Sequence, residues 1–309
     1  MSFLKKHKTL LLALLVMALW GSLYPAAKLA YKAYDIVTPA DIILFIGIRF
    51  TVCGALIFLF ARTRKGGKEN VAKAKSALPI ILLSGVFAII LNYAFTNIGL
   101  SMTAGSKTAI IKQIGSLFYI SLSFLFFKDD HPTKRKLIAA LIGFLGIVAL
   151  NIDGGGIVFR LGDILVLCAS FCTMLGNVTS KKVFSRGIEP LVSTGISQFF
   201  GGIVMLAVGL LLGGRVSYSL DSSLLLMLYF FVASSVSYCL WYIILSRGAL
   251  SNLFIIKFAE PLFSCLFSAM LLGENVFKWQ YLAAFLLICS GILICSYKKH
   301  EKRSENQKA

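Results

Sequence analysis

The sequence predicts an all-α integral membrane protein with ten transmembrane helices, arranged as two inverted five-helix repeats. Three observations support this fold class. Hydrophobic residues make up 58% of the 309 positions, which is more than a water-soluble globule of this length carries. Apolar runs of about 20 residues, the length that crosses a hydrocarbon core as a helix, recur along the chain. The stretches AIIKQIGSLF (109–118) and FIIKFAEPLF (254–263) indicate an internal repeat.

The expected crossings are continuous apolar segments, whereas a transmembrane β-barrel needs alternating segments of about ten residues. In order, they are 9–30, 41–61, 77–99, 103–127, 136–151, 161–181, 190–213, 222–245, 249–272 and 279–297. The first follows a basic segment but is too long for a secretory signal and lacks a small-residue cleavage site. The charged run GGKEN after the second crossing is expected to be a flexible connection.

The basic residues lie mainly on one side of the predicted membrane. Of the 31 lysines and arginines, 22 fall in the termini and in the connections on the same side, four fall on the opposite side, and five lie inside helices. By the positive-inside rule, both termini are therefore cytoplasmic and the chain is a multi-pass protein of the cytoplasmic membrane. The net charge of +18 is thus explained by orientation, and no nucleic-acid partner is expected.

The repeat relates residues 145 positions apart. Residues 93–150 and 238–295 share 17 identities in 58 positions without a gap, including Tyr93 with Tyr238 and Lys112 with Lys257. The predicted units are therefore 9–151 and 161–297, followed by a basic cytoplasmic tail at 298–309. A unit with an odd number of crossings enters the membrane from opposite sides in its two copies, which is an inverted repeat typical of transporters.

Several motifs along the chain resemble one transporter family. They are WGSLYPAAK in the first helix, IRF in the second, NYAFTNIGLSMTAGS across the third and fourth, and AEPLFSCLFSAMLLGE in the ninth. Together with the five-plus-five duplication, they are similar to the EamA family of the drug/metabolite transporter superfamily. The resemblance implies a carrier, most often an exporter of amino acids and related metabolites. The first half departs from the family pattern, with Ser116 and Asp129 where the second half has Pro261 and Glu274, so the fourth helix is expected to be less kinked than the ninth.

Charged residues inside the predicted helices are the main candidates for a binding site, since each costs about 2.5 to 3.5 kcal/mol at a helix centre. The basic ones are Lys28, Arg49, Lys107, Lys112 and Lys257, and the acid is Glu260. Lys112 lies about 15 Å along its helix and has no acid one turn away, which favours a wet central cavity. Lys257 and Glu260, three residues apart, either bind cargo or form an internal ion pair.

The other candidates have competing structural roles. Lys107 can extend to the interface, and Arg49 can hold helices together through backbone carbonyls. Lys28 follows a helix-weakening proline near the outer end of its helix and stays a candidate cargo contact. Tyr93, Tyr238 and Trp241 carry polar groups on helices expected to face the cavity, although packing or an interfacial belt explains such aromatics equally well.

These observations predict a secondary transporter that exports amino acids or related small metabolites by alternating access, with the cargo carboxylate held by central lysines. A carrier of organic or phosphorylated anions is the alternative, and a non-transporting receptor or assembly factor represents a different class. Motifs for hydrolases, metalloproteases and phosphate loops are absent, so no enzyme, metal site or cofactor is expected. Glu260 is a candidate proton carrier.

Overall fold

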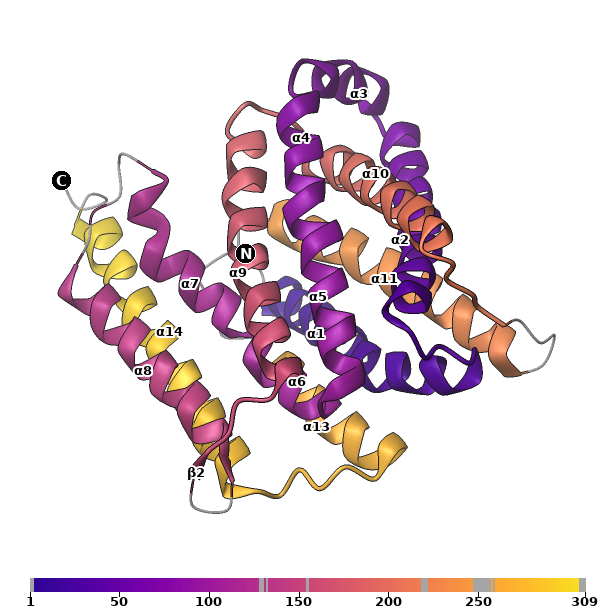
Figure 1. Ribbon diagram of the computed structural model, residues 1–309. Coiled ribbons are helices and arrows are strands. Elements are labelled where there is room, and N and C mark those ends of the chain that lie inside the picture. The colour runs from indigo at the N-terminus through magenta and orange to yellow at the C-terminus, as the bar shows by residue number, and fades with distance from the viewer. Residues whose placement is uncertain are drawn as a thin grey trace.

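The computed structural model describes residues 3–127, 131, 133–153, 156–217, 222–246, 257 and 259–305. The regular secondary structure of the described chain is helical apart from one antiparallel pair of two-residue strands, β1 (Ile152–Asp153) and β2 (Gly156–Ile157). Figure 1 shows long helices of opposite direction packed side by side, as expected for a helical membrane protein. The all-α architecture predicted from the sequence is therefore confirmed.

The helices follow the predicted apolar segments closely. The first part of the chain forms α1 (Phe3–Ala33), α2 (Pro39–Thr63), α3 (Gly67–Ser76), α4 (Leu78–Gly85), α5 (Asn92–Met102), α6 (Gly105–Lys112), α7 (Ile114–Leu122) and α8 (Lys134–Leu150). The second part forms α9 (Leu161–Phe184), α10 (Pro190–Leu211), α11 (Ser222–Ser246), α13 (Ala259–Leu272) and α14 (Trp279–Glu305).

Length and hydropathy identify membrane-crossing candidates among the described helices. Six are long and apolar enough to span a bilayer: 11–33, 39–63, 78–102, 161–184, 190–211 and 224–241. Three shorter apolar helices cover 136–150, 259–272 and 279–294. The ninth predicted crossing, 249–272, lies partly outside the described residues. Ten crossings therefore stay a prediction.

Two helix pairs pack closely through glycine. In the α2–α10 pair, a Cβ added at Gly54 would overlap the backbone nitrogen of Phe199, so only glycine permits this approach. In the α8–α14 pair, a Cβ at Gly146 would lie 3.2 Å from the Ala284 carbonyl oxygen, and one at Gly291 would lie 2.9 Å from that of Ala139. The two contacts are reciprocal, because each residue of the second contact is 145 positions away from its counterpart in the first.

The structure departs from the sequence-based expectations in two connections. The segment after α2 is the helix α3 rather than a flexible connection, because Ala74 is fully buried against an apolar cluster that includes Ile57 and Val183. The predicted crossing at 103–127 is divided at Gln113, where α6 ends and α7 begins. The expectation that the fourth helix is less kinked than the ninth stays a prediction, because much of the ninth predicted crossing lies outside the described residues.

A short π-helical segment, Val86–Leu91, joins α4 to α5. Such segments often occur at functional sites because they shift the register of the following helix. Here the shift lies directly before Asn92 and Tyr93, which both border the central cavity. The break at Gln113 and this π-helical segment thus lie on neighbouring helices beside the same space.

Candidate functional site

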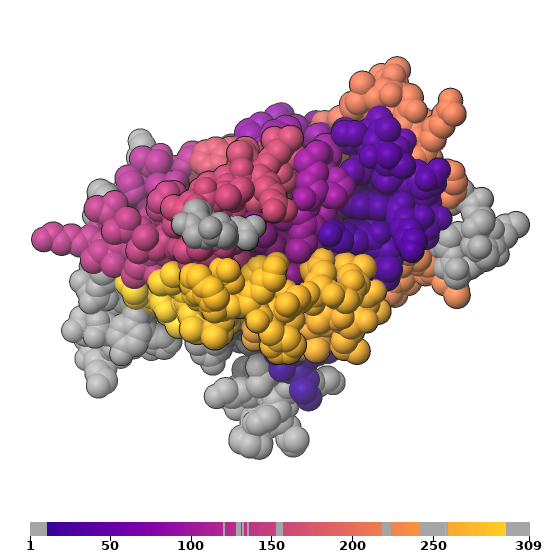
Figure 2. Space-filling model, turned by 60° about the horizontal axis from the view of Figure 1, so that its bottom comes forward, coloured from indigo at the N-terminus to yellow at the C-terminus, as the bar shows by residue number. Residues whose placement is uncertain are grey.

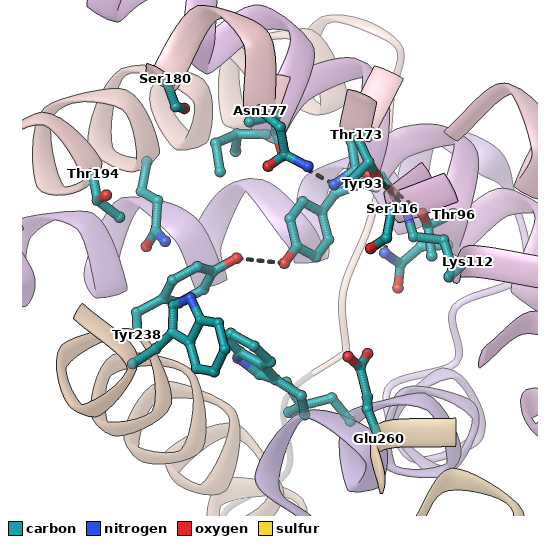
Figure 3. Close-up of a pocket in the computed structure, with 18 of the residues that line it drawn as sticks. Tyr93, Thr96, Lys112, Ser116, Thr173, Asn177, Ser180, Thr194, Tyr238 and Glu260 are labelled. Atoms are coloured by element: carbon teal, nitrogen blue, oxygen red, sulfur yellow. Dashed lines mark hydrogen bonds between the residues drawn. The ribbon is translucent and has the colours of Figure 1, made fainter. Parts of the chain in front are cut away.

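A cavity of about 270 Å³, bordered by many polar side chains, lies between the helices (Figure 3). Its lining comes from both parts of the chain, with side chains from α1, α2, α4, α5, α6, α7, α9, α10, α11 and α13. Cavities that bind drug-sized ligands usually measure about 300–1,000 Å³. The size of this cavity therefore fits a small solute.

Lys112 is the cation whose surroundings are most informative. Its Nζ donates to the Thr173 hydroxyl at 2.7 Å and to the Asn92 side-chain oxygen, so the described ammonium partners are neutral. The residue is the last of α6, and the negative end of a helix dipole favours a cation. An ammonium has three protons to donate, which leaves one beyond these two bonds for another acceptor.

Glu260 faces the cavity from the first turn of α13. The positive end of that helix favours a carboxylate, and Tyr24 donates to Glu260 Oε1 at 3.3 Å. Figure 3 shows Glu260 and Lys112 on the same side of the cavity, with the carboxylate directed into the open space. Helix ends thus offset part of the cost of placing both charges inside the protein.

Lys257 and Glu260 do not form the internal ion pair considered from the sequence. The ion pairs within 4.0 Å among the described residues are Lys28–Glu274, Arg64–Glu189 and Lys107–Asp163. Lys257 Nζ instead lies 5.2 Å from the centre of the Trp241 ring, a cation–π distance. Lys257 and Glu260 therefore border the cavity without a direct ion pair between them.

Arg49 is buried on the α2 side of the cavity, with only 3% of the residue exposed. Its Nε and Nη2 donate to the Ser234 hydroxyl at 3.0 and 2.7 Å. The guanidinium also lies 5.1 Å from the Phe50 ring centre and 4.9 Å from that of Phe230. The sequence left backbone carbonyls as one alternative for Arg49, whereas the structure provides a serine and aromatic rings that join α2 to α11.

The aromatic candidates form one connected group. The hydroxyl groups of Tyr93 and Tyr238 are 2.7 Å apart and share a hydrogen bond across the cavity (Figure 3). Trp20 contacts both Tyr238 and Trp241, with ring centres 5.7 and 5.4 Å away. Because Tyr93 and Tyr238 are separated by the repeat spacing, equivalent atoms of the two predicted units meet here.

The structure brings together seven of the eight candidates named from the sequence. The cavity is lined by Lys112, Lys257, Glu260, Arg49, Tyr93, Tyr238 and Trp241. Among these residues, three cations face one acid. Lys28 lies elsewhere, 3.6 Å from Glu274, and Lys107 is paired with the buried Asp163 at 2.8 Å.

Sequence reasoning missed the neutral polar residues of the cavity. They include Asn92, Gln113, Thr173, Asn177, Ser180, Thr194 and Gln198. Single amides and hydroxyls occur in many membrane helices, so composition does not distinguish them. The spacing of Thr173, Asn177 and Ser180, at three or four residues on one helix, is the signal that predicts a shared face.

A second cavity of about 460 Å³ is bordered by Lys28, Lys107, Arg160, Glu274 and Lys278. Glu274 accepts hydrogen bonds from the Gly105 amide at 2.8 Å, the Ser106 amide at 3.1 Å and the Ser106 hydroxyl at 2.7 Å. These three hydrogen bonds cap the N-terminus of α6. Together with the Lys28–Glu274 ion pair, they are called the Glu274 contact below. Figure 2 shows the chain from α13 to α14 as a band across this end of the molecule.

The Glu274 contact holds the carboxylate in its ionised form. Partial burial raises the pKa of Glu274, but the hydrogen bonds from Ser106 and Gly105 and the nearby Lys28 outweigh burial and lower it below its ordinary value. Hydrogen bonds to a carboxylate and the N-terminal end of a helix both favour the charged form. The contact is therefore intact at neutral pH.

The family profile and the related sequences that match this chain are those of transporters. The sequence profile of the EamA-like transporter family matches residues 7–152 and 160–296. The chain is 27% identical to an uncharacterized transporter, YvbV, of Bacillus subtilis over 98% of this chain and 96% of the relative. It is also 27% identical to a probable amino-acid metabolite efflux pump of Escherichia coli, over 92% and 93% of the two chains. A crystal structure with 19% identity covers 96% of this chain with a TM-score of 0.63, and 98% of its own chain is covered, which shows a shared fold.

Proposed function

This chain belongs to the EamA-like transporter family, and on that basis we propose that it exports amino acids or closely related metabolites across the cytoplasmic membrane. The observation that carries the proposal is the environment of Lys112. Its ammonium faces a small cavity and has only neutral described partners, so a cargo carboxylate is the acceptor that would complete it. The name of the Escherichia coli relative, a probable amino-acid metabolite efflux pump, agrees with this cargo class.

An amino acid fits the charges of the cavity with both of its main-chain groups. The carboxylate binds Lys112, while the ammonium binds Glu260, the acid on the same side of the cavity. A charge-assisted hydrogen bond is about twice as strong as a neutral one, so each interaction contributes to selection. Lys257, held against Trp241, adds a second lysine charge beside the cavity.

We infer that the cavity is accessible from the cytoplasm in this conformation. It reaches Ser180 near the end of α9 and Thr194 near the start of α10, and the predicted topology places both positions toward the cytoplasm. The Glu274 contact closes the opposite end by joining α13 to α6. Export then requires this contact to break as the cytoplasmic side closes, which is alternating access.

The inverted repeat remains part of the proposal and has two supports. Tyr93 and Tyr238, equivalent positions at the spacing of 145, share a hydrogen bond. The glycine contacts between α8 and α14 are reciprocal at the same spacing. Contacts between equivalent residues, and contacts that occur in reciprocal pairs, are what a two-fold axis between the units would produce.

A carrier of organic or phosphorylated anions is the second candidate. It is favoured by the excess of cations among the ionisable cavity residues, namely Arg49, Lys112 and Lys257 against Glu260. Such a cargo would use the lysines but would be repelled by Glu260. The acid therefore distinguishes the two cargo classes, and in either case Glu260 is the proposed proton carrier.

Transport in proteoliposomes tests the proposal. The purified chain is reconstituted, and the uptake and efflux of labelled amino acids, dicarboxylates and sugar phosphates are measured with and without a pH gradient. We expect amino acids to be carried and Lys112→Met to abolish their transport. Transport of dicarboxylates alone would favour the carrier of organic or phosphorylated anions. Absence of any transport by a well-folded protein would favour a receptor or assembly factor.

A further inference from the structure

The second cavity, of about 460 Å³, gathers basic side chains on the side of the molecule where the sequence has few. Lys28, Lys107, Arg160 and Lys278 border it, together with the acid Glu274. Arg160 and Lys278 are two of the four basic residues that the sequence places on the predicted outer side. The positive-inside rule favours basic residues on the opposite side, so it does not explain this concentration.

The charges at this cavity leave a positive excess. Lys28 and Lys107 each pair with an acid in the contacts described above, which neutralises two of the four positive charges. Arg160 and Lys278 add the other two. Guanidinium and ammonium groups both bind phosphate, so the cavity is suited to a phosphate group.

Arg160 and Lys278 are both flanked by exposed apolar side chains. Phe277 and Trp279, on either side of Lys278, are 96% and 59% exposed. The exposed apolar residues around Arg160 are Ile157, Val158, Phe159 and Leu161. They lie in the connections and at the first positions of α9 and α14, where a membrane protein meets the lipid headgroups. Apolar and aromatic side chains in such places anchor a protein in the interface.

The two flanked cations are brought together by a contact between α14 and β1. Gln280, in the first turn of α14, donates to the Ile152 carbonyl oxygen at 3.4 Å, and both residues border the cavity. Figure 1 shows β2 beside the connection from α13 to α14. A soluble phosphate compound would use the cations alone, whereas a phospholipid would use the cations and the apolar side chains beside them.

We propose that this cavity binds the headgroup phosphate of an anionic phospholipid from the outer leaflet. Arg160 and Lys278 bind the phosphate, and Phe277 and Trp279 contact the apolar part of the lipid. The site lies beside Lys28 and therefore next to the Glu274 contact. The inference needs the membrane location and the predicted orientation but no particular cargo, so it stands even if the proposed function fails.

Trp279 allows the lipid to be detected at this position. The chain has three tryptophans, and Trp20→Phe with Trp241→Phe leaves Trp279 as the fluorophore. This chain is placed in phosphatidylcholine vesicles that contain a small fraction of a lipid with brominated chains, which quench tryptophan on contact. We expect brominated phosphatidylglycerol to quench as strongly as an at least about fivefold larger fraction of brominated phosphatidylcholine, because the basic residues attract the anionic lipid.

Two double variants decide whether the preference belongs to this cavity. Arg160→Gln with Lys278→Gln should make the two brominated lipids quench equally. The matched control, Lys73→Gln with Lys75→Gln, removes two exposed positive charges from α3 on the predicted cytoplasmic side and should keep the preference. If the first double variant does not fold, Lys278→Gln alone, at an exposed position of the connection, should lose part of the preference.

A soluble phosphate compound is the competing ligand. Glycerol 3-phosphate and a short-chain phosphatidylglycerol are added separately to the full chain in detergent. We expect the lipid alone to raise the Tm, and to do so less in Arg160→Gln with Lys278→Gln. An equal rise with glycerol 3-phosphate would overturn the assignment to a lipid. Equal quenching by the two brominated lipids, or a preference that survives the loss of both cations, would overturn the site itself.

Discussion

At the residue scale, Lys112 and Lys107 show that two lysines of one helix serve different purposes. Lys107 is paired with Asp163, which is fully buried, so its charge is neutralised within the protein. Lys112 has two neutral partners and a helix end, which stabilise its charge without neutralising it. We infer that Lys107 is structural and that Lys112 is available to a ligand.

The contrast predicts opposite outcomes for the same substitution. Lys112→Met should abolish transport and leave the Tm unchanged or higher, because no buried acid loses its partner. Lys107→Met should destabilise the protein by about 3–5 kcal/mol, because it leaves the Asp163 charge unpaired. Thermal unfolding in detergent and transport in vesicles check both. Normal transport by a well-folded Lys112→Met protein would exclude the binding role.

Lys257 and Glu260 predict a second result at this scale. Because they are not joined within 4 Å, each single change, Lys257→Met or Glu260→Gln, should cost less stability than breaking the Lys107–Asp163 pair. The double variant should be folded and inactive. If Glu260 carries the coupling proton, Glu260→Gln should lose the response to a pH gradient but keep exchange of cargo. A stable and fully active double variant would eliminate both functional roles.

The sequence predicted the charged side of the site better than the neutral side. A lysine inside an apolar helix is costly, so Lys112 and Lys257 were distinctive without a structure. The roles of Asn92, Thr173 and Gln198 depend on which helices pack together, and no local pattern specifies that packing. Lys28 shows the same limit, since only the structure places it beside Glu274.

At the element scale, the charged side chains Lys112, Glu260 and Glu274 lie at or against the ends of helices. Most of the apolar helices follow from their continuous hydrophobic runs, and α8 and α14 begin 145 positions apart, as the repeat predicts. The break at Gln113 has no proline or glycine at the break and was missed. The structure places the Lys112 charge at the end of α6, while Glu274 caps the start of that helix. One short helix therefore connects Lys112 at the candidate site to the Glu274 contact.

The Glu274 contact predicts a pH-dependent difference in stability. Because the folded-state pKa of Glu274 is lowered, its contribution is fully present above the ordinary pKa of 4.5 and is lost as the pH falls through the lower folded value. The Tm difference between wild type and Glu274→Gln should thus be constant from about pH 8 to about pH 6 and should vanish only in stronger acid. A difference that disappears near neutral pH would show that the carboxylate is not held as described.

The same contact predicts a change in conformation. Glu274→Gln should weaken the closure between α13 and α6, and so increase labelling of cysteines introduced beside Lys28 by a membrane-impermeant reagent added from outside. Ser106→Ala, which removes one of the three hydrogen bonds, should have a smaller effect in the same direction. Unchanged labelling in both variants would place the closure elsewhere.

At the scale of the whole molecule, the predicted topology determines which connections face the cytoplasm and which face the outside. The proposed direction of transport requires α3 and the C-terminal tail on the cytoplasmic side, and the connection between α13 and α14 outside. A cysteine at Asn275 should react with an impermeant reagent applied to intact cells, and a cysteine at Lys68 should react only after the membrane is opened. The reverse pattern would invert the direction of transport that we propose.

We propose that Lys112 binds the carboxylate of the cargo and that Glu260 binds its ammonium. The most direct test is competition in proteoliposomes between the best-carried labelled amino acid and unlabelled analogues lacking one main-chain group. We predict that the amino acid itself competes fully, while its carboxamide and its deaminated form each compete at least about tenfold more weakly, since each loses one charge-assisted interaction. Equal competition by the carboxamide would contradict the account, because the carboxylate would then have no role at Lys112.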